Sequence, residues 1–353
     1  MIRRSMASVC FILAVLLFSG VSAGQAQAAV TQEYNWKLVS EEVDGDFMTD
    51  WAHEFAKQMK EWSDGKINIE VYPYGTLGGE RDINELVQLG EVEFVMSDYG
   101  WISAFVPQAQ VLALHYILPR EKSVEVFNDV FNNGKVRGLL EKSFQAKNFQ
   151  PLGYLHEGWQ WVTHNKKIRT PEDCKGVKIR VMGSPMLQKG YGAFGFNAIT
   201  LDYGEIYSAL QMNLIDAQVQ PMFANYSMGF YEQVKFITNM EAELFVAIPL
   251  ANREFMESLP KDIRDKILEV WAGITKPAGE DSLKREEKFI KLVKEKRPEI
   301  EFYKFTDEDI KPFHELAIPV REEYLKSGGE GAKEILDALL ADIEAAKKKH
   351  GVK

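Results

Sequence analysis

Hydrophobic positions follow two different spacings along the first half of the chain. Ile67, Ile69 and Val71 alternate with polar residues, which is the two-residue period of a strand. Residues 49–62 instead repeat apolar side chains every three to four positions, which predicts a helix. Further strands are predicted at 36–39 and 94–97, and further helices at 80–89, 124–131 and 136–145. This alternation favours a mostly parallel sheet with helices on both faces.

The second half of the chain repeats this order and then becomes helical. An extended segment is predicted at 150–163, helices are predicted to begin at Ser184 and at 206, and strands are predicted at 177–181, 217–219, 234–237, 245–250 and 302–305. Ile263, Ile267 and Trp271 share one face of a helix that Pro277 is expected to end or kink, and a charged helix follows it to about residue 295. Helices are predicted to close the chain.

The first 28 residues have the pattern of a secretory signal. Arg3 and Arg4 precede an apolar run at 11–18, and small residues at 26–28 suit a signal peptidase. The run is shorter than the roughly 20 residues that a membrane span needs, which disfavours the alternative of an anchored helix. We therefore expect cleavage near Ala28 and a periplasmic protein.

Charge and cysteine content exclude several classes of function. The formal net charge is −10, whereas nucleic-acid-binding proteins are usually basic. Only Cys174 lies outside the predicted signal, so neither an internal disulfide nor a multi-cysteine zinc site can form. An inert, packed cysteine is the favoured interpretation of Cys174.

No motif in the sequence indicates catalysis. The G-x-G-x-x-G match at 190–195 closes a predicted helix, whereas a dinucleotide fingerprint follows a strand and opens a helix. The six histidines are scattered, and the sequence has neither a G-x-S-x-G elbow nor H-E-x-x-H. We expect no cofactor, no metal and no enzymatic activity. An exported enzyme or a ligand-sensing module remains the alternative.

Arg180 is the strongest candidate for a binding residue. It lies between Ile179 and Val181 in a predicted strand, where a half-buried guanidinium needs a partner. Its planar fork matches a carboxylate or a sulfonate, although a solvated arginine or an internal salt bridge would also fit. Aromatic residues that could wall a binding cleft are dense nearby, and a few are expected to touch the ligand. They include Tyr99, Trp101, Tyr154, Trp159, Trp161, Tyr191, Tyr203, Tyr207, Phe223 and Tyr226.

Several segments together resemble the solute-binding proteins of tripartite ATP-independent periplasmic (TRAP) transporters. The run N-K-K-I-R-T-P-E-D-C-K-G-V-K-I-R at 165–180 is similar to a signature of that family. So are G-E-I-Y-S-A-L-Q at 204–211, I-D-A-Q at 215–218 and Y-G-T-L-G-G-E-R at 74–81. The resemblance covers nearly the whole chain after the predicted signal.

The resemblance implies an α/β fold of two lobes with hinge strands and a long kinked helix that spans both. Lobe I would comprise 29–153 with about 246–305, lobe II 154–245, and helices at 306–353 would pack on the lobes. It also implies a monomer that binds a small organic anion between the lobes and delivers it to membrane permease subunits.

The resemblance further assigns residues to the ligand. Arg180 would hold its acid group, and Asn225 and Glu80 would line the cleft. Many members carry a second arginine where this chain has Gln160, which cannot supply a positive charge. A monocarboxylate or short sulfonate is therefore favoured over a C4-dicarboxylate. The full set of expected ligand-binding residues is Arg180, Gln160, Asn225, Glu80, Trp159, Trp101, Tyr203, Met182 and Phe223.

Overall fold

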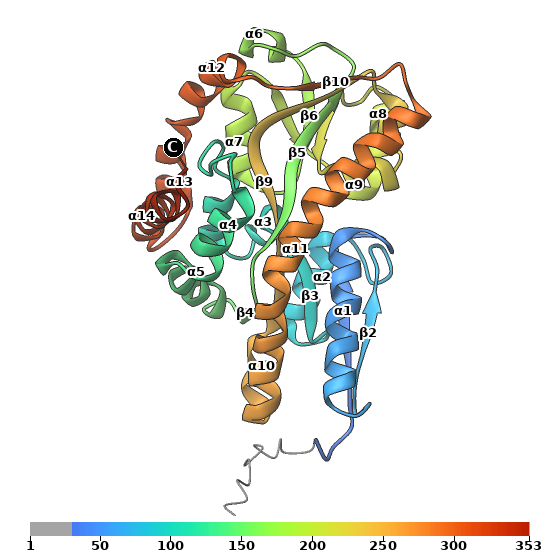
Figure 1. Ribbon diagram of the computed structural model, residues 1–353, viewed down its shortest axis with the longest axis vertical. Coiled ribbons are helices and arrows are strands. Elements are labelled where there is room, and N and C mark those ends of the chain that lie inside the picture. Colours follow the sequence, from blue (N-terminus) through green and yellow to red (C-terminus); the bar gives the residue numbers. More distant parts are fainter. Residues whose placement is uncertain (1–29, 353) are drawn as a thin grey trace, which may run out of the picture.

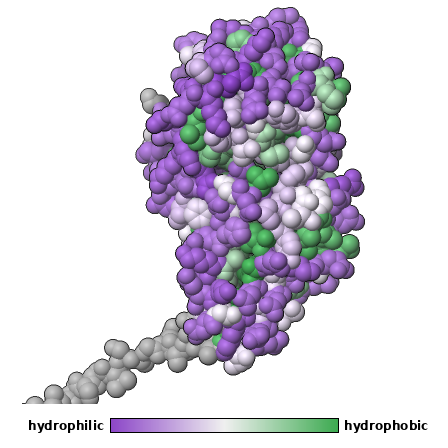
Figure 2. Space-filling view, turned by 90° about the vertical axis from the view of Figure 1, so that its right-hand side faces the viewer, coloured by the Kyte–Doolittle hydropathy of each residue, from purple (hydrophilic) through white to green (hydrophobic). Residues whose placement is uncertain are grey.

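A computed structural model describes residues 30–352, so the predicted signal sequence lies outside the described residues. Within 30–352, no helix combines the length and hydrophobicity that crossing a membrane would require. The face of the molecule drawn in Figure 2 is mostly hydrophilic, and its hydrophobic residues lie in small separate groups.

One sheet runs through the molecule in the order β2-β1-β3-β9-β5-β8-β6-β7. At one end, β1 pairs with β2 and β3 in parallel, and at the other end β6 pairs with β7 and β8 in parallel. We call the half that contains β1–β3 lobe I and the half that contains β6–β8 lobe II (Figure 1). The strands are β1 (Tyr34–Ser40), β2 (Ile67–Tyr72), β3 (Phe94–Asp98), β4 (Phe149–Pro151), β5 (Leu155–His164), β6 (Lys178–Val181), β7 (Asn197–Thr200), β8 (Ala217–Gln220), β9 (Phe236–Asn252) and β10 (Glu301–Lys304).

Helices cover the sheet in both lobes (Figure 1). The helices are α1 (Phe47–Trp62), α2 (Glu80–Leu89), α3 (Tyr99–Ile102), α4 (Ser123–Phe127), α5 (Lys135–Gln145), α6 (Pro171–Cys174), α7 (Pro185–Ala193), α8 (Ile206–Gln211), α9 (Met222–Ser227), α10 (Arg253–Ser258), α11 (Lys261–Lys296), α12 (Asp307–Ala317), α13 (Val320–Ser327) and α14 (Ala332–His350). The segments of 3-10 or π-helix are η1 (Pro107–Ala113), η2 (Asn128–Asn132), η3 (Tyr203–Glu205) and η4 (Phe230–Gln233).

The strands β5 and β9 connect the lobes and run antiparallel to each other. Two separate strands were predicted at 234–237 and 245–250, and this was wrong, because β9 is one strand of 17 residues. The pairing of β5 with β9 shifts register on both sides of Trp159. Gly158 has φ +110° and Glu241 has φ +48°, so both strands are irregular where they pass between the lobes.

Helix α11 crosses both lobes as a single element of 36 residues, drawn in orange in Figure 1. Pro277 lies inside it without ending it. The face predicted from Ile263, Ile267 and Trp271 is buried, and the Trp271 ring stacks on Phe55 of α1 at 4.8 Å between ring centroids. The helix is therefore anchored in the core of lobe I, and it also packs against α9 of lobe II.

Candidate functional site

The carboxyl ends of strands from both lobes meet around one cavity. The cavity holds about 20 Å³ of space, so the lobes are closed on each other. Ligands of α/β proteins commonly bind outside the carboxyl ends of parallel strands, which is where this cavity lies. Its lining residues are Glu41, Glu42, Met48, Glu80, Asp98, Trp101, Arg180, Met182, Tyr203, Gln220 and Phe245.

Arg180, in β6 of lobe II, reaches this cavity with two unpaired nitrogens. Its side chain is fully buried, and its Nε donates to the carbonyl of Leu201 at 2.8 Å. Neither Nη1 nor Nη2 has a hydrogen-bond partner among the described residues. Burial lowers the pKa of Arg180, while the nearby charges of Glu80 and Asp98 oppose that shift. The guanidinium thus offers two parallel donors to an acid group.

Lobe I contributes carboxyl groups to the opposite side. Glu41 and Glu42 follow β1, Asp98 ends β3, and Glu80 opens α2. Burial raises the pKa of Glu42 to about 8, that of Glu80 to about 7 and that of Asp98 to about 6, and it raises the pKa of Glu41 well above its usual range. One arginine therefore faces four buried carboxyl groups.

Two further carboxyl groups lie next to this wall. Burial, followed by the charge of Glu42, raises the pKa of Glu157 well above its usual range, and burial raises the pKa of Asp46 to about 7. Several of the acceptor oxygens have no hydrogen-bond donor within residues 30–352. They are Oε2 of Glu41, Oε2 of Glu80 and both oxygens of Glu157. Buried acceptors without donors are costly, so this side of the cavity is suited to N–H or O–H groups.

Hydrogen bonds across the cleft connect the closed lobes. The Tyr203 N–H donates to Oε1 of Glu80 at 2.9 Å. The Gly204 N–H donates to the Tyr74 hydroxyl at 3.0 Å, and the Ser227 hydroxyl donates to Asp46 at 2.7 Å. These contacts join Glu80, Tyr74 and Asp46 of lobe I to lobe II.

Five of the nine expected ligand-binding residues line the cavity. They are Arg180, Glu80, Trp101, Tyr203 and Met182.

The other four expected residues are buried elsewhere. Asn225 donates to the carbonyls of Gln220 and Pro221 and so fixes the start of α9, and Gln160 donates to the Tyr99 hydroxyl at 3.3 Å. Phe223 stacks on Phe47, and Trp159 lines a separate cavity of about 10 Å³. None of these four side chains lines the cavity in this closed arrangement, and their contact with a ligand stays a prediction.

Six lining residues were not anticipated from the sequence: Glu41, Glu42, Met48, Asp98, Gln220 and Phe245. Glu41, Asp98 and Gln220 stand at or directly after the carboxyl ends of β1, β3 and β8. The strands β1 and β3 were predicted, so a search for polar residues at their carboxyl ends would have found Glu41, Glu42 and Asp98.

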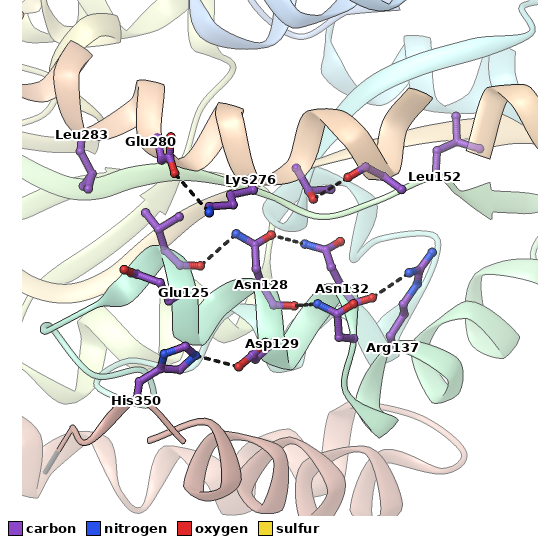
Figure 3. Close-up of a pocket in the computed structure, with 14 residues that line it drawn as sticks. Glu125, Asn128, Asp129, Asn132, Arg137, Leu152, Lys276, Glu280, Leu283 and His350 are labelled. Atoms are coloured by element: carbon purple, nitrogen blue, oxygen red, sulfur yellow. Dashed lines mark hydrogen bonds and ion pairs between the residues drawn. The ribbon is translucent and has the colours of Figure 1, made fainter. Parts of the chain in front are cut away.

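A larger pocket of about 480 Å³ lies between η2 and α11 and differs in chemistry. Most of its polar side chains are paired with one another or with the backbone (Figure 3). Asn132 donates to Asn128 at 3.0 Å, Arg137 donates to the Asn132 carbonyl at 2.7 Å, and His350 pairs with Asp129. The cavity at Arg180 is smaller, but it is the one in which buried donors and acceptors lack partners.

The remaining candidate motifs have structural roles. A side chain at Gly190, in the G-x-G-x-x-G match, would meet the His115 ring, so this glycine admits close packing of α7. Cys174 is buried and unpaired, and burial raises the pKa of its thiol to about 12. In the described part of the chain, histidine, cysteine and acidic residues form no group of three that could hold a metal ion.

Known proteins are similar to this chain in both sequence and fold. Residues 38–327 match the model of the bacterial extracellular solute-binding protein family 7, DctP. The ectoine-binding periplasmic protein TeaA of Halomonas elongata is 29% identical over 323 residues, covering 91% of this chain and 93% of TeaA. The ectoine/5-hydroxyectoine-binding periplasmic protein UehA of Ruegeria pomeroyi is 27% identical over 339 residues, covering 96% of this chain and 98% of UehA.

The solved structure of the ectoine-binding protein of the TeaABC TRAP transporter matches with a TM-score of 0.84 at 29% identity. The match covers 88% of this chain and all of that chain. It confirms the two-lobe α/β fold with a long helix. The matched proteins bind solutes for transport and are not enzymes, as the sequence predicted. This chain belongs to the DctP family of TRAP solute-binding proteins.

Proposed function

We propose that this protein is the periplasmic receptor of a TRAP transporter for a compact zwitterion, with one acid group and one positively charged N–H donor group. The single observation that carries the proposal is the asymmetry of the cavity. One side offers two unpaired nitrogens of Arg180, and the other offers buried carboxyl groups without donors.

The acid group of the ligand would bind Arg180. Nη1 and Nη2 are buried and unpaired, and a bidentate carboxylate would satisfy both with charge-assisted hydrogen bonds. The fixed bond from Nε to the Leu201 carbonyl would hold the fork in place while the ligand enters.

The positive group would face Glu41, Glu42 and Glu157. Oxygens of Glu41 and Glu157 lack donors, and burial raises the pKa of all three groups. A cationic N–H donor would supply hydrogen bonds and charge at once, replacing the protons that these carboxyl groups otherwise hold. Ectoine, which the similar proteins TeaA and UehA are named for binding, carries one carboxylate and one amidinium and fits this description.

A C4-dicarboxylate fits less well, because its second acid group would approach these carboxyl groups. Gln160 stands where many members of the family carry a second arginine. Its side chain donates to Tyr99 and does not line the cavity. A short sulfonate that also carries an ammonium group has the same charge pattern as a carboxylate zwitterion and is included in the proposal.

The cleft suggests how capture would proceed. An open form would admit the solute, Arg180 of lobe II and the carboxyl groups of lobe I would bind its two ends, and closure would bury both charged groups. The closed monomer would then deliver the solute to the membrane permease subunits. We keep the predicted lobe boundaries at about 153 and 245 as part of this proposal.

A thermal-shift panel tests the ligand class. The protein would be screened with ectoine, an aminosulfonate (taurine), an uncharged-tail monocarboxylate, a sugar acid and succinate. A ligand that binds only the folded state stabilises it by about 2.7 kcal/mol at 100 times its Kd. We expect a rise in Tm with a zwitterion. A rise confined to succinate would overturn the proposal.

Variants at Arg180 test the clamp. Arg180→Ala should abolish the Tm shift, and Arg180→Lys should retain a small part of it, because lysine keeps the charge and loses the fork. The matched control is Arg253→Ala, which removes a partly exposed arginine that lies outside the cavity and pairs with Glu257. An unchanged shift in folded Arg180→Ala would remove Arg180 from the site.

A further inference from the structure

Two short segments from opposite lobes meet in matching register beside the cavity. One is Asp98–Trp101 at the end of β3, and the other is Arg180–Gly183 at the end of β6. The charge of Arg180 lowers the pKa of Asp98, and the charge of Asp98 raises the pKa of Arg180. Two residues after them, Gly100 and Met182 lie against each other. We call 98–101 and 180–183 the latch segments.

Each latch segment places a glycine against a large side chain of the other. A Cβ atom at Gly183 would lie 2.7 Å from Cε3 and 2.8 Å from Cζ3 of Trp101. A Cβ atom at Gly100 would lie 2.6 Å from Cβ of Met182. Both separations are shorter than carbon atoms tolerate without displacement. The contacts are reciprocal, since lobe I supplies Trp101 and Gly100 while lobe II supplies Gly183 and Met182.

Hydrogen bonds within each lobe hold residues of both segments in position. Asp98 accepts from the backbone N–H groups of Gly100 and Trp101, and the Ser103 hydroxyl donates to the Gly100 carbonyl at 2.8 Å. In lobe II, Arg180 is bound to the Leu201 carbonyl. An added methyl group at either glycine therefore meets a neighbour that is fixed close to its place.

Neither glycine is needed for its own backbone conformation. The glycines of this chain with positive φ do not include Gly100 or Gly183, so alanine can adopt either conformation without backbone strain. Glycine at these two positions serves close approach between the lobes.

We propose that Gly100 and Gly183 are positioning residues that let the latch segments interlock, and that this interlock sets how far the lobes close around the ligand. Closure to this depth brings Arg180 of lobe II and the carboxyl groups of lobe I to opposite sides of one small cavity. The proposal rests on closure during capture, but not on the chemical identity of the solute.

Distance measurements between the lobes test this proposal. Nitroxide labels on Lys60→Cys in α1 and Gln211→Cys in α8, both exposed positions, report the separation of lobes I and II by pulsed electron paramagnetic resonance. Cys174→Ser removes the remaining native cysteine outside the predicted signal. Spectra would be recorded without ligand and with ectoine as the probe. We expect the closed distance in the parent protein and its loss in Gly183→Ala.

Second-site changes separate the latch from a general packing defect. Adding Trp101→Ala to Gly183→Ala removes the ring that the new methyl group meets, so the closed distance should return. Adding Met182→Ala to Gly100→Ala should not restore it, because the shortest contact is to Met182 Cβ. Met182→Gly should restore it in part, since the new Cβ atom still lies 3.0 Å from Asp98 Oδ1. Gly192→Ala is the matched control, since a Cβ atom there meets nothing within 4 Å.

Three results would overturn the latch: a closed distance retained in Gly183→Ala, rescue by Met182→Ala, or the absence of a closed population in the parent protein both without ligand and with the compound that raises its Tm most in the thermal-shift panel. The ligand proposal is judged separately by the thermal-shift panel. If no compound in the panel raises Tm, the proposed ligand class is wrong. The distances measured without ligand, in the parent protein and in Gly183→Ala, would then test the latch alone.

Discussion

At the scale of residues, the cavity combines one guanidinium with an excess of buried carboxyl groups. A buried carboxylate without a partner is so unfavourable that it takes up a proton instead. The raised pKa values of Glu42, Asp46 and Glu80, about 8, 7 and 7, express this cost. Groups with such perturbed pKa values gather at functional sites, and here they identify the side of the cavity that lacks positive charge.

These protons make the stability of the ligand-free protein depend on pH. The pKa of Glu42 is about 8 in the folded protein against an ordinary 4.5, so between these values the folded state holds a proton that the unfolded chain has lost. Stability therefore declines as pH rises from about 4.5 to about 8. We expect Tm to fall as pH rises over this range, and this fall adds to any change that surface charges cause.

Glu42→Gln removes one of the groups responsible and should flatten the decline, with a higher Tm than the parent at pH 8. The control is Glu344→Gln, an exposed residue paired with Lys347, which should leave the slope unchanged. If the parent protein becomes more stable from pH 5 to pH 8, the buried carboxyl groups of lobe I do not hold protons as described.

At the scale of elements, α11 crosses both lobes, and Trp271 anchors it in lobe I. Trp271 is fully buried and stacks on Phe55, and its indole N–H has no acceptor within the described part of the chain. Trp271→Ala should lower the free energy of unfolding by about 3–5 kcal/mol. Trp271→Phe should cost much less, because it keeps the stacked ring and removes the unpaired donor.

Urea unfolding followed by circular dichroism measures both variants of Trp271. Lys276→Ala, an exposed change on the same helix, should stay within about 0.5 kcal/mol of the parent. An equal loss for Trp271→Ala and Trp271→Phe would contradict this account, because the aromatic ring that phenylalanine retains would then contribute nothing to stability.

Most elements follow from the spacing of apolar residues, and the failures have identifiable causes. The helix at 80–89 was predicted with the bounds that α2 has. In β9, the run Glu241-Ala242-Glu243 interrupts the apolar pattern, and the sequence does not reveal that Glu241 bonds Arg120 and Lys304 while Glu243 bonds Tyr191. Those partners come from distant segments and let one strand continue through polar residues.

Arg180 was predicted on one side of the cavity, and only Glu80 and Trp101 were predicted on the lobe I side. Arg180 was found because a charged residue stands out between Ile179 and Val181 in a strand. The wall of Glu41, Glu42 and Asp98 was not, because each residue alone resembles a solvated carboxylate after a strand. Only the assembled sheet brings β1 and β3 together and turns three ordinary residues into one acidic surface.

At the scale of the whole molecule, the two lobes contribute side chains of opposite charge to one cavity. Lobe II holds Arg180, and lobe I holds Glu41, Glu42, Glu80 and Asp98. A solute with a charge of each sign would bind both lobes at once and would therefore favour the closed state by its differential affinity. The latch segments lie where this closure is completed.

Proton release on binding tests the central claim most directly. Ectoine would be titrated into the protein by calorimetry at pH 7 in buffers of different ionisation enthalpy. A cationic group would displace protons from the carboxyl groups whose pKa values are raised by burial. We therefore predict net proton release on binding and an affinity that rises between about pH 6 and pH 8. Proton uptake, with tighter binding of succinate as pH falls, would show that the acidic wall receives an acid instead and would contradict the account.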